Sequence, residues 1–390
     1  MSLIDDCIVI LLILIAVWQM IEKLSKEKCE STGFVFSLLA VYHFSFSVLF
    51  FLYPEPLDSN YYYNLGIAME ADNLISLPTK STGAMAMLSY WLCNSITHLY
   101  QLTANFIFAT ISLFGLFLIF LMLPELKTNS KFSKGIQVLI FFPFFFPSIH
   151  YWSTSVSKEA IMIGGLSAIV YMVYKFRRKN ILLLPMVIAS LFVRPHIVIL
   201  FLAGGFVTWF CLVKLPCKLK LGISTLTIII GLMAINYFMS THGNKSLSFQ
   251  SFNKMISQWE QSIGYSDTNS ANVSLKDMIF PFKFCTFWFR PFFENLTVKI
   301  LVGSIENLML IIAIISLCTK RFLKFASSVN LVVKMSIGGA LGVSLFMCLV
   351  SSNFGYAMRQ KSTILPFVCL LVVSYWINTV ITNKDEISTA

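Results

Sequence analysis

Long apolar runs are the feature that most limits what this chain can fold into. They hold about 17–23 residues without the apolar–polar alternation of strands, which is the length a helix needs to cross roughly 30 Å of hydrocarbon. The 390 residues are 57% hydrophobic and only 12% charged, whereas a soluble domain carries about twice that charge. We therefore expect an all-α, polytopic membrane protein with about eleven transmembrane helices.

Short clusters of Lys and Arg lie in alternate connections between these runs, so that all of them fall on one side of the membrane. The predicted spans cover residues 3–21, 33–53, 101–123, 136–150, 159–174, 181–194, 196–213, 221–239, 299–318, 331–350 and 363–381. The basic clusters lie at residues 23–28, 127–134, 175–179, 214–220 and 320–324. Because basic loops remain cytoplasmic, this pattern predicts the N-terminus outside and the C-terminus in the cytoplasm. No cleavable signal peptide is expected, since acidic residues precede the first run.

Two outer regions are long enough to carry function within what we expect to be a single integral membrane domain, 1–390. Residues 54–100 begin with an acidic, Tyr-rich loop and continue through a mixed stretch, 84–99, that is typical of an interfacial helix. Residues 240–298 form a second large outer loop that ends in an aromatic run. The spans between 136 and 213 contain prolines, which predict broken or short helices lining a polar cavity.

Several function classes are disfavoured by the residue pattern. The formal charge of +11 sits mostly in the short loops, and no basic stripe with interleaved aromatics indicates nucleic-acid binding. The nine cysteines are scattered without CxxC or Cys/His metal spacing, so neither a metal site nor a disulfide framework is expected. Hydrolase triads, Walker loops and dinucleotide-binding glycines are also missing, and we expect no cofactor. Gly164-Gly165 and Gly338-Gly339 indicate close helix packing instead.

Some cations on the predicted outer side break the orientation pattern. They sit at span ends in separate parts of the chain: Lys158, Arg194, Arg290, Arg359 and Lys361. Arg makes bidentate contacts to phosphate and Lys acts as a point charge, so the set could converge on a lipid-linked phosphate or pyrophosphate. Two alternatives remain open. The same cations could pair with outer acids such as Glu159, Glu294 and Glu306, or extend to lipid headgroups.

Asp58 is the candidate catalytic carboxylate. It precedes three tyrosines, of which Tyr61 and Tyr62 are candidate sugar contacts through their ring faces and hydroxyls. A carboxylate beside a wet cavity can take a proton from a sugar hydroxyl as a general base. The alternative is that Asp58 caps the following helix while the tyrosines form an interfacial belt.

Two of the histidines are candidate substrate contacts. His150 precedes a polar outer turn that leads into a predicted helix start at Ser157, and a helix start of this kind favours phosphate. His196 follows Arg194 by two residues and could titrate near neutrality. His43 is better explained as a hydrogen-bonded packing residue.

Taken together, these motifs resemble those of bacterial integral-membrane glycosyltransferases of the GT-C type and of the O-antigen or exopolysaccharide polymerases, the Wzy proteins. The resemblance rests on the loop 58–63, the turn 147–159, Arg194-Pro195-His196, Phe289-Arg290-Pro291-Phe292 with Glu306, and the segment 353–361. It implies a GT-C-like fold, Asp58 as the base, and Arg290 and Arg359 as residues that handle undecaprenyl-pyrophosphate substrates. The first outer loop has no Asp-x-Asp pair, so a metal-dependent mechanism is not expected.

The resemblance implies a function in surface polysaccharide biosynthesis at the bacterial inner membrane. The chain would polymerise or transfer sugars from an undecaprenyl-(pyro)phosphate-linked donor on the periplasmic side. Its expected partners are the polyprenyl-linked saccharide, membrane lipid, and other assembly proteins such as a flippase and a chain-length regulator. The alternative is a transporter or flippase of lipid-linked oligosaccharides, because broken helices and buried charges suit that class too.

Overall fold

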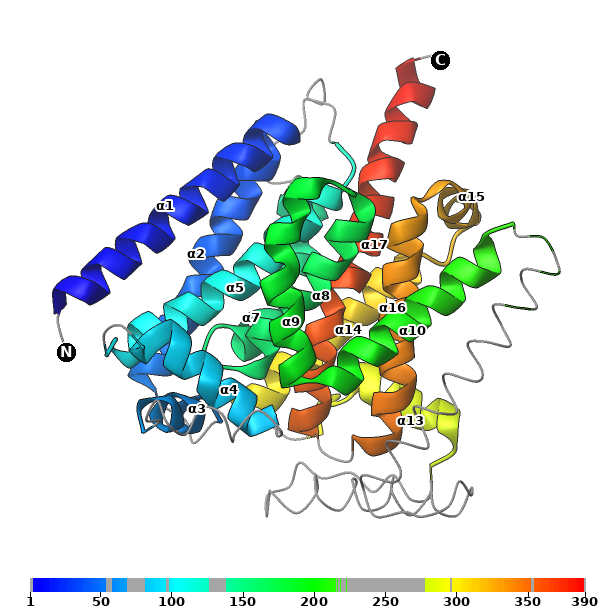
Figure 1. The fold of residues 1–390 in the computed structure, drawn as a ribbon. Coiled ribbons are helices and arrows are strands. Elements are labelled where there is room, and N and C mark those ends of the chain that lie inside the picture. Colours follow the sequence, from blue (N-terminus) through cyan, green and yellow to red (C-terminus); the bar gives the residue numbers. More distant parts are fainter. Residues whose placement is uncertain are drawn as a thin grey trace.

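The computed structural model describes most of the chain as a bundle of helices (Figure 1). The described residues are 3–53, 58–68, 81–95, 98–125, 138–214, 278–294, 297–351 and 354–388, with 216, 218 and 222. Within these ranges every regular element is helical, which confirms the all-α prediction. The predicted span 221–239 and most of the loop 240–298 lie outside the described residues.

Seven helices are long and apolar enough to cross a membrane. They are α1 (Leu3–Glu27), α2 (Glu30–Leu52), α5 (Gln101–Met122), α10 (Pro195–Leu212), α14 (Val298–Ser316), α16 (Leu331–Val350) and α17, whose helix covers Phe354–Ser388. Each overlaps a predicted span, and a polytopic helical membrane protein is therefore confirmed. An eighth span results if α7 (Pro147–Ser153) and α8 (Lys158–Tyr174) are counted as one bent pair.

The proline-rich middle of the chain is where the elements differ most from the predicted spans. Residues 136–150 do not form one helix: Pro143 lies in the 3₁₀-helix η3 (Phe142–Phe145), and Pro147 begins α7. Because proline lacks an amide hydrogen, it is tolerated at a helix start but interrupts a continuous span. The α7 and α8 axes differ by 112°. In the same way, residues 178–193 divide into η4 (Arg178–Leu183) and the ten-residue α9 (Leu184–Val193).

Shorter helices cover the two ends of the bundle. Near one end lie α3 (Asp58–Ile67), α4 (Ser81–Ser89), the π-helix η2 (Tyr90–Asn94) and α13 (Phe280–Phe289), whereas α15 (Lys320–Ser328) lies at the other (Figure 1). The predicted interfacial helix 84–99 is thus divided between α4 and η2, which ends at Asn94. The α4 helix is packed onto the bundle, because its Ser81 hydroxyl donates to the Val193 carbonyl at the end of α9, 2.6 Å away.

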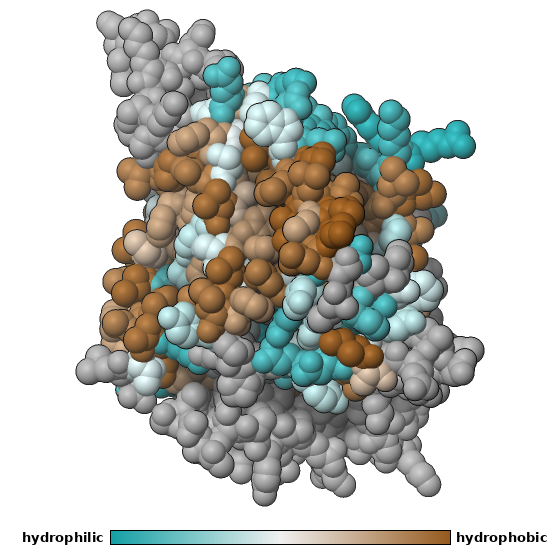
Figure 2. Space-filling model, turned by 90° about the vertical axis from the view of Figure 1, so that its left-hand side faces the viewer, coloured by the Kyte–Doolittle hydropathy of each residue, from teal (hydrophilic) through white to brown (hydrophobic). Residues whose placement is uncertain are grey.

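The surface of the bundle has an apolar band around its middle and polar side chains at its ends. Figure 2 shows hydrophobic side chains across the middle of one face, with hydrophilic side chains above and below this band. Many outward-facing residues are large and apolar, for example Leu12, Trp18 and Val41, which are 59%, 67% and 72% exposed. Exposed apolar surface of this extent is typical of a face covered by lipid.

Candidate functional site

Four separate elements bring charged side chains to one end of the bundle. The first turn of α8 contributes Lys158 and Glu159, and the first residue of α3 is Asp58. Arg194 lies in the break between α9 and α10, and Arg359 lies on the second turn of α17. We call these five residues the Glu159 cluster.

Local sequence chemistry explains two of these positions. The Ser157 hydroxyl accepts a hydrogen bond from the Ala160 amide, 3.3 Å away, and so caps α8 directly before Lys158 and Glu159. Pro195 is the first residue of α10, where its missing amide hydrogen has no cost, and it cannot continue α9. Arg194 consequently has a non-helical backbone between two helices, and its side chain points inward to Glu159 and Gln360.

Glu159 is the centre of the cluster. Its carboxylate is fully buried, and its Oε1 accepts hydrogen bonds from Arg194 Nη2 and Arg359 Nε, each 2.6 Å away. Arg194 Nη1 also donates to Gln360 Oε1 at 3.0 Å. Glu159 Oε2 has no donor among the described residues. A carboxylate this deeply buried is stable only because two guanidinium groups compensate for its lost hydration.

Arg359 connects the buried carboxylate to the surface. Its Nε faces Glu159, while its Nη1 donates to Asp58 Oδ2 at 2.5 Å. The Asp58 side chain is 51% exposed and that of Arg359 17%, whereas Glu159 is inaccessible. Solvent exposure therefore decreases across the cluster, from the Asp58 carboxylate through Arg359 to the Glu159 carboxylate. Its three cations and two carboxylates leave one excess positive charge.

Aromatic rings line the same group. The Tyr62 hydroxyl lies 3.5 Å from Asp58 Oδ2, and Lys158 Nζ lies 5.2 Å from the centre of the Tyr62 ring. Arg359 stacks over Trp152 with 5.9 Å between the guanidinium carbon and the ring centre. Burial, and to a lesser extent the Asp58 charge, raises the pKa of Tyr62 well above its ordinary value, so this hydroxyl remains a donor at neutral pH. Tyr61 is 56% exposed beside it.

Arg290 lies elsewhere at this end of the bundle. It pairs with Glu294 and stacks over Phe354, with 4.9 Å between the guanidinium carbon and the ring centre. Phe354 begins α17, so about 7.5 Å of helix axis separates it from Arg359. Among the described residues Arg290 has no hydrogen bond or ion pair with Asp58 or Glu159, and α17 is the element that links the two arginines.

Lys361 belongs to a second buried polar group. Its Nζ donates to the Trp288 carbonyl at 3.2 Å and to Asn307 Oδ1, and its side chain is fully buried. The Asn307 amide donates in turn to the Pro291 carbonyl at 2.9 Å. Lys361 thus connects α17 to α13 and α14.

Glu306 lies next to Asn307 on α14. Its carboxylate accepts from the Ser148 amide at 2.7 Å and the Ser148 hydroxyl at 2.5 Å, at the start of α7. The sequence offered three outer acids as partners for the cations. Glu159 and Glu294 form ion pairs with arginines. Glu306 instead accepts hydrogen bonds from Ser148 at the start of α7.

The candidate histidines occupy different surroundings. His150 is fully buried and faces His43, with 2.7 Å between the two Nδ1 atoms, and its Nε2 donates to the Phe144 carbonyl at 2.8 Å. The His150 ring therefore lies in the packing between α2 and α7. His43 also lies within reach of the Ser112 hydroxyl, 2.9 Å away, as expected of a packing residue. His196 is half-buried in the first turn of α10, beside Arg194.

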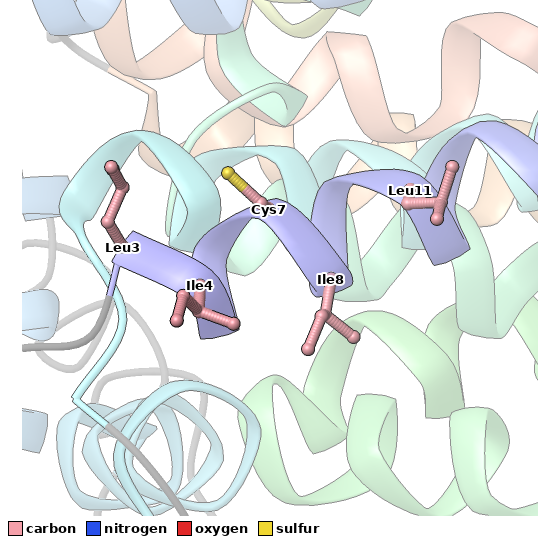
Figure 3. Close-up of a pocket in the computed structure, with 5 residues that line it drawn as sticks. All are labelled: Leu3, Ile4, Cys7, Ile8 and Leu11. Carbon is pink, nitrogen blue, oxygen red and sulfur yellow. The ribbon is translucent and has the colours of Figure 1, made fainter.

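Two hollows on the described surface lie away from the cluster. One is formed by a single face of α1, with Leu3, Ile4, Cys7, Ile8 and Leu11 around it (Figure 3). The other lies between α1, α5 and α9, and Phe114 and Phe117 are among its lining residues. Both are apolar and suit lipid chains. Over the described residues, no group of three His, Cys, Asp or Glu side chains has a geometry for a metal ion.

Comparisons with known proteins give no relative for this chain. No protein-family model matches it, and neither does any curated protein or solved structure. The function of the chain therefore rests on the geometry of the site and on the motif resemblance seen in the sequence.

Sequence reasoning named most of the cluster but missed its centre. Asp58, Lys158, Arg194 and Arg359 were singled out, whereas Glu159 was considered only as a counter-charge. The available signal was a carboxylate on an otherwise apolar helix, since α8 continues from Glu159 through a long apolar stretch. Gln360 gave no signal, because only the three-dimensional structure brings it to Arg194.

Proposed function

We propose that this chain is a bacterial inner-membrane enzyme that polymerises or transfers sugars from an undecaprenyl-(pyro)phosphate-linked donor. The reaction would occur on the periplasmic side, in the synthesis of a surface polysaccharide such as O-antigen or exopolysaccharide. The proposal includes a GT-C-like fold with about eleven spans, and it favours a repeat-unit polymerase over a single-sugar transferase. No cofactor or metal has a role in it.

The contact between Asp58 and Arg359 carries this proposal. A general base must be accessible and must lie near the group that stabilises the leaving charge. Asp58 is half exposed and touches Arg359 Nη1 at 2.5 Å, and Arg194 and Lys158 belong to the same cluster. Because Glu159 fixes the Nε edge of Arg359, the Nη1 side of this guanidinium is oriented toward Asp58 and toward an arriving anion.

The proposed reaction uses these groups as follows. Asp58 accepts the proton of an acceptor-sugar hydroxyl, whose oxygen attacks the anomeric carbon of the donor. The bond from this carbon to the phosphate oxygen breaks, and the lipid-linked (pyro)phosphate leaves with the bonding electron pair. Arg359, Arg194 and Lys158 stabilise the negative charge that develops on it. Tyr61 offers its exposed ring face and hydroxyl to the sugars, and the buried Tyr62 holds its hydroxyl beside Asp58.

Other candidate residues have supporting roles in this scheme. Arg290 would contact the outer phosphate of a pyrophosphate or a second substrate, since it lies at the same end of α17. His196 would contact the substrate next to Arg194. Lys361 and His150, both buried, would hold α17 and α7 in place for Arg359 and for the turn before Lys158. A flippase and a chain-length regulator are the proposed protein partners.

Glycan profiling of the native bacterium tests the function. Deletion of the gene should remove long surface glycan chains, and the unaltered gene should restore them. Arg359→Ala and Arg290→Ala should insert into the membrane at normal levels but fail to restore long chains. The control is Lys23→Ala, which lies near the C-terminal end of α1, at the end of the bundle away from the Glu159 cluster. This variant should restore long chains. Long chains in the deletion strain would refute the function, and long chains with Arg359→Ala would remove that residue from the mechanism.

A transporter or flippase is the second candidate. The observations that favour it are the 112° bend between α7 and α8 and the buried charged groups Glu306 and Lys361, which are 2% and 0% exposed. Charges within spans often mark a transport path. The Glu159 cluster disfavours transport, because it lies at helix ends and not at mid-depth.

Reconstituted vesicles separate the two candidates. Lipid-linked oligosaccharide that moves between leaflets without growing in length would favour the transporter. Growth of the glycan on one leaflet, with release of polyprenyl (pyro)phosphate, would favour the enzyme.

A further inference from the structure

The short helix α15 lies flat at the end of the bundle opposite the Glu159 cluster. Its nine residues, Lys320–Ser328, extend only about 14 Å and cannot cross a bilayer. Figure 1 shows α15 nearly end-on at the top of the bundle, while α14 and α16 run away from it. The Thr319 hydroxyl fixes its start by accepting from the Phe322 amide at 3.1 Å.

One face of α15 is docked on α17. Phe322 and Phe325 each lie 5.4 Å from the Tyr375 ring, measured between ring centres, and Phe325 is buried. The Tyr375 hydroxyl also hydrogen-bonds the Thr319 hydroxyl at 2.7 Å. These contacts prevent rotation of α15 about its axis, so the residues of its other face are held outward.

The outward face combines cations with an exposed apolar side chain. Lys320, Arg321 and Lys324 are exposed, and Leu323, between them, is 71% exposed. The helix contains no acidic residue to pair with them. Cations in the first half of a helix also oppose its dipole, so they do not stabilise α15 itself.

Three lysines at this end of the bundle have acidic partners, in contrast to the lysines of α15. Lys23 lies 4.0 Å from Glu27 and Lys175 lies 3.5 Å from it, while Lys26 pairs with Glu22. Lys320 and Lys324 have no ion pair with any described residue. The ammonium groups of these two lysines are therefore exposed and accessible to an anionic partner outside the protein.

We propose that the outward face of α15 binds the headgroups of anionic phospholipids in the bilayer that the protein spans. Lys320, Arg321 and Lys324 would contact lipid phosphates, and Leu323 would enter the boundary of the acyl chains. A basic face with an interposed apolar residue on a helix parallel to the membrane is suited to such a surface. This inference does not depend on the glycosyltransferase proposal.

Native mass spectrometry of the purified full-length chain tests the inference. The protein is released from nanodiscs that contain equal amounts of phosphatidylglycerol and phosphatidylcholine, and the retained lipids are counted. The unaltered protein should retain phosphatidylglycerol preferentially. In Lys320→Gln/Lys324→Gln, the apparent affinity for phosphatidylglycerol should fall by about fivefold per cation. Arg321 is left unchanged because it has another contact in the protein.

The control removes the same number of charges at the same end of the bundle. Lys23→Gln/Lys26→Gln changes lysines that already have acidic partners, and it should retain phosphatidylglycerol as the unaltered protein does. An equal loss in both variants would show a general effect of net charge and would overturn the proposal. Equal retention by the unaltered protein and the α15 variant would also overturn it.

A salt titration of the unaltered protein tests the same site without relying on the folding of a variant. Binding of phosphatidylglycerol should weaken steeply as NaCl is raised from about 0.1 M to about 0.5 M, since salt screens exposed charges. Binding that does not change over this range, or that is equal for phosphatidylcholine, would contradict a headgroup site on α15.

Discussion

At the residue scale, Glu159 determines how the charged groups are arranged. Two guanidinium groups meet at its Oε1, so Arg194 and Arg359 are held by a buried partner and not by the solvent. The sequence predicts that these arginines lie at span ends on one side of the membrane. It could not show that a single carboxylate joins them, because α8, the α9–α10 break and α17 are distant in the chain.

Loss of the Glu159 charge should destabilise the fold. Glu159→Gln keeps the size of the side chain but leaves two cations next to a neutral amide. Removing one partner of a buried ion pair costs about 3–5 kcal/mol. Thermal unfolding in detergent, followed by intrinsic fluorescence, should show a clear decrease in the melting temperature.

The matched control for Glu159 is an exposed ion pair at the same end of the bundle. Glu294→Gln removes the acidic partner of Arg290. The Glu294 side chain is 26% exposed and the Arg290 side chain 34%. Such a pair contributes about 0–1 kcal/mol after solvent screening. Similar small changes for both variants would contradict a central structural role for Glu159.

At the element scale, small residues allow helices to pack closely around the site. Gly338 and Gly339 on α16 face α10: a Cβ atom on Gly338 would lie 2.7 Å from the Gly204 carbonyl oxygen, and one on Gly339 would lie 2.7 Å from that of Phe201. On α8, a Cβ on Gly165 would lie 2.9 Å from the Met186 carbonyl oxygen. The close packing predicted from both glycine pairs is thus confirmed.

The predicted helix boundaries agree with the structure where the run is uniformly apolar. They differ from it where proline interrupts the run. The helices α2, α5 and α16 begin and end within about three residues of the predicted bounds, whereas α1 continues about six residues beyond its predicted end. The run through Pro143 and Pro147 instead became η3 and α7, because hydropathy alone does not show where a backbone amide is missing. Which helices pack together also does not follow from composition.

Added volume at the α10–α16 contact should separate these helices. In Gly204→Ala the new methyl group would overlap the backbone carbonyl of Gly338, which a side-chain rotation cannot relieve. Overpacking of this kind costs about 1–3 kcal/mol. Melting temperature in detergent is the measurement, with Ala203→Val, on the exposed side of the same helix, as the control. Equal melting temperatures for both variants and the unaltered protein would argue against tight packing here.

At the scale of the whole molecule, the two ends of the bundle differ in their chemistry. The Glu159 cluster lies at the start of α8, and Lys175 follows its end, about 25 Å away. At that second end Lys28 Nζ donates to the Leu123 carbonyl at 2.6 Å, and Lys175 pairs with Glu27. Among the described residues, the basic clusters 23–28, 175–179 and 320–324 lie at one end, and the site lies at the other (Figure 1).

This separation predicts the orientation of the protein in the membrane. Ser95, after η2, is exposed near the cluster end, and Ser328, at the end of α15, is exposed at the basic end. Ser95→Cys should react with a membrane-impermeant maleimide in intact spheroplasts, whereas Ser328→Cys should react only after permeabilisation. The unaltered chain gives the background from the native cysteines. The reverse pattern would place the Glu159 cluster in the cytoplasm.

Turnover by the purified protein tests the central claim most directly, namely that Asp58 and Arg359 form a catalytic site for lipid-linked sugars. Proteoliposomes that contain a polyprenyl-pyrophosphate-linked repeat unit should produce longer glycans with the unaltered protein and with Asp5→Asn, an acid-to-amide change elsewhere at this end. Asp58→Asn should bind the donor but extend it at least about 100-fold more slowly, which is the usual loss when a general base is removed. Extension by Asp58→Asn at the unaltered rate would contradict the account.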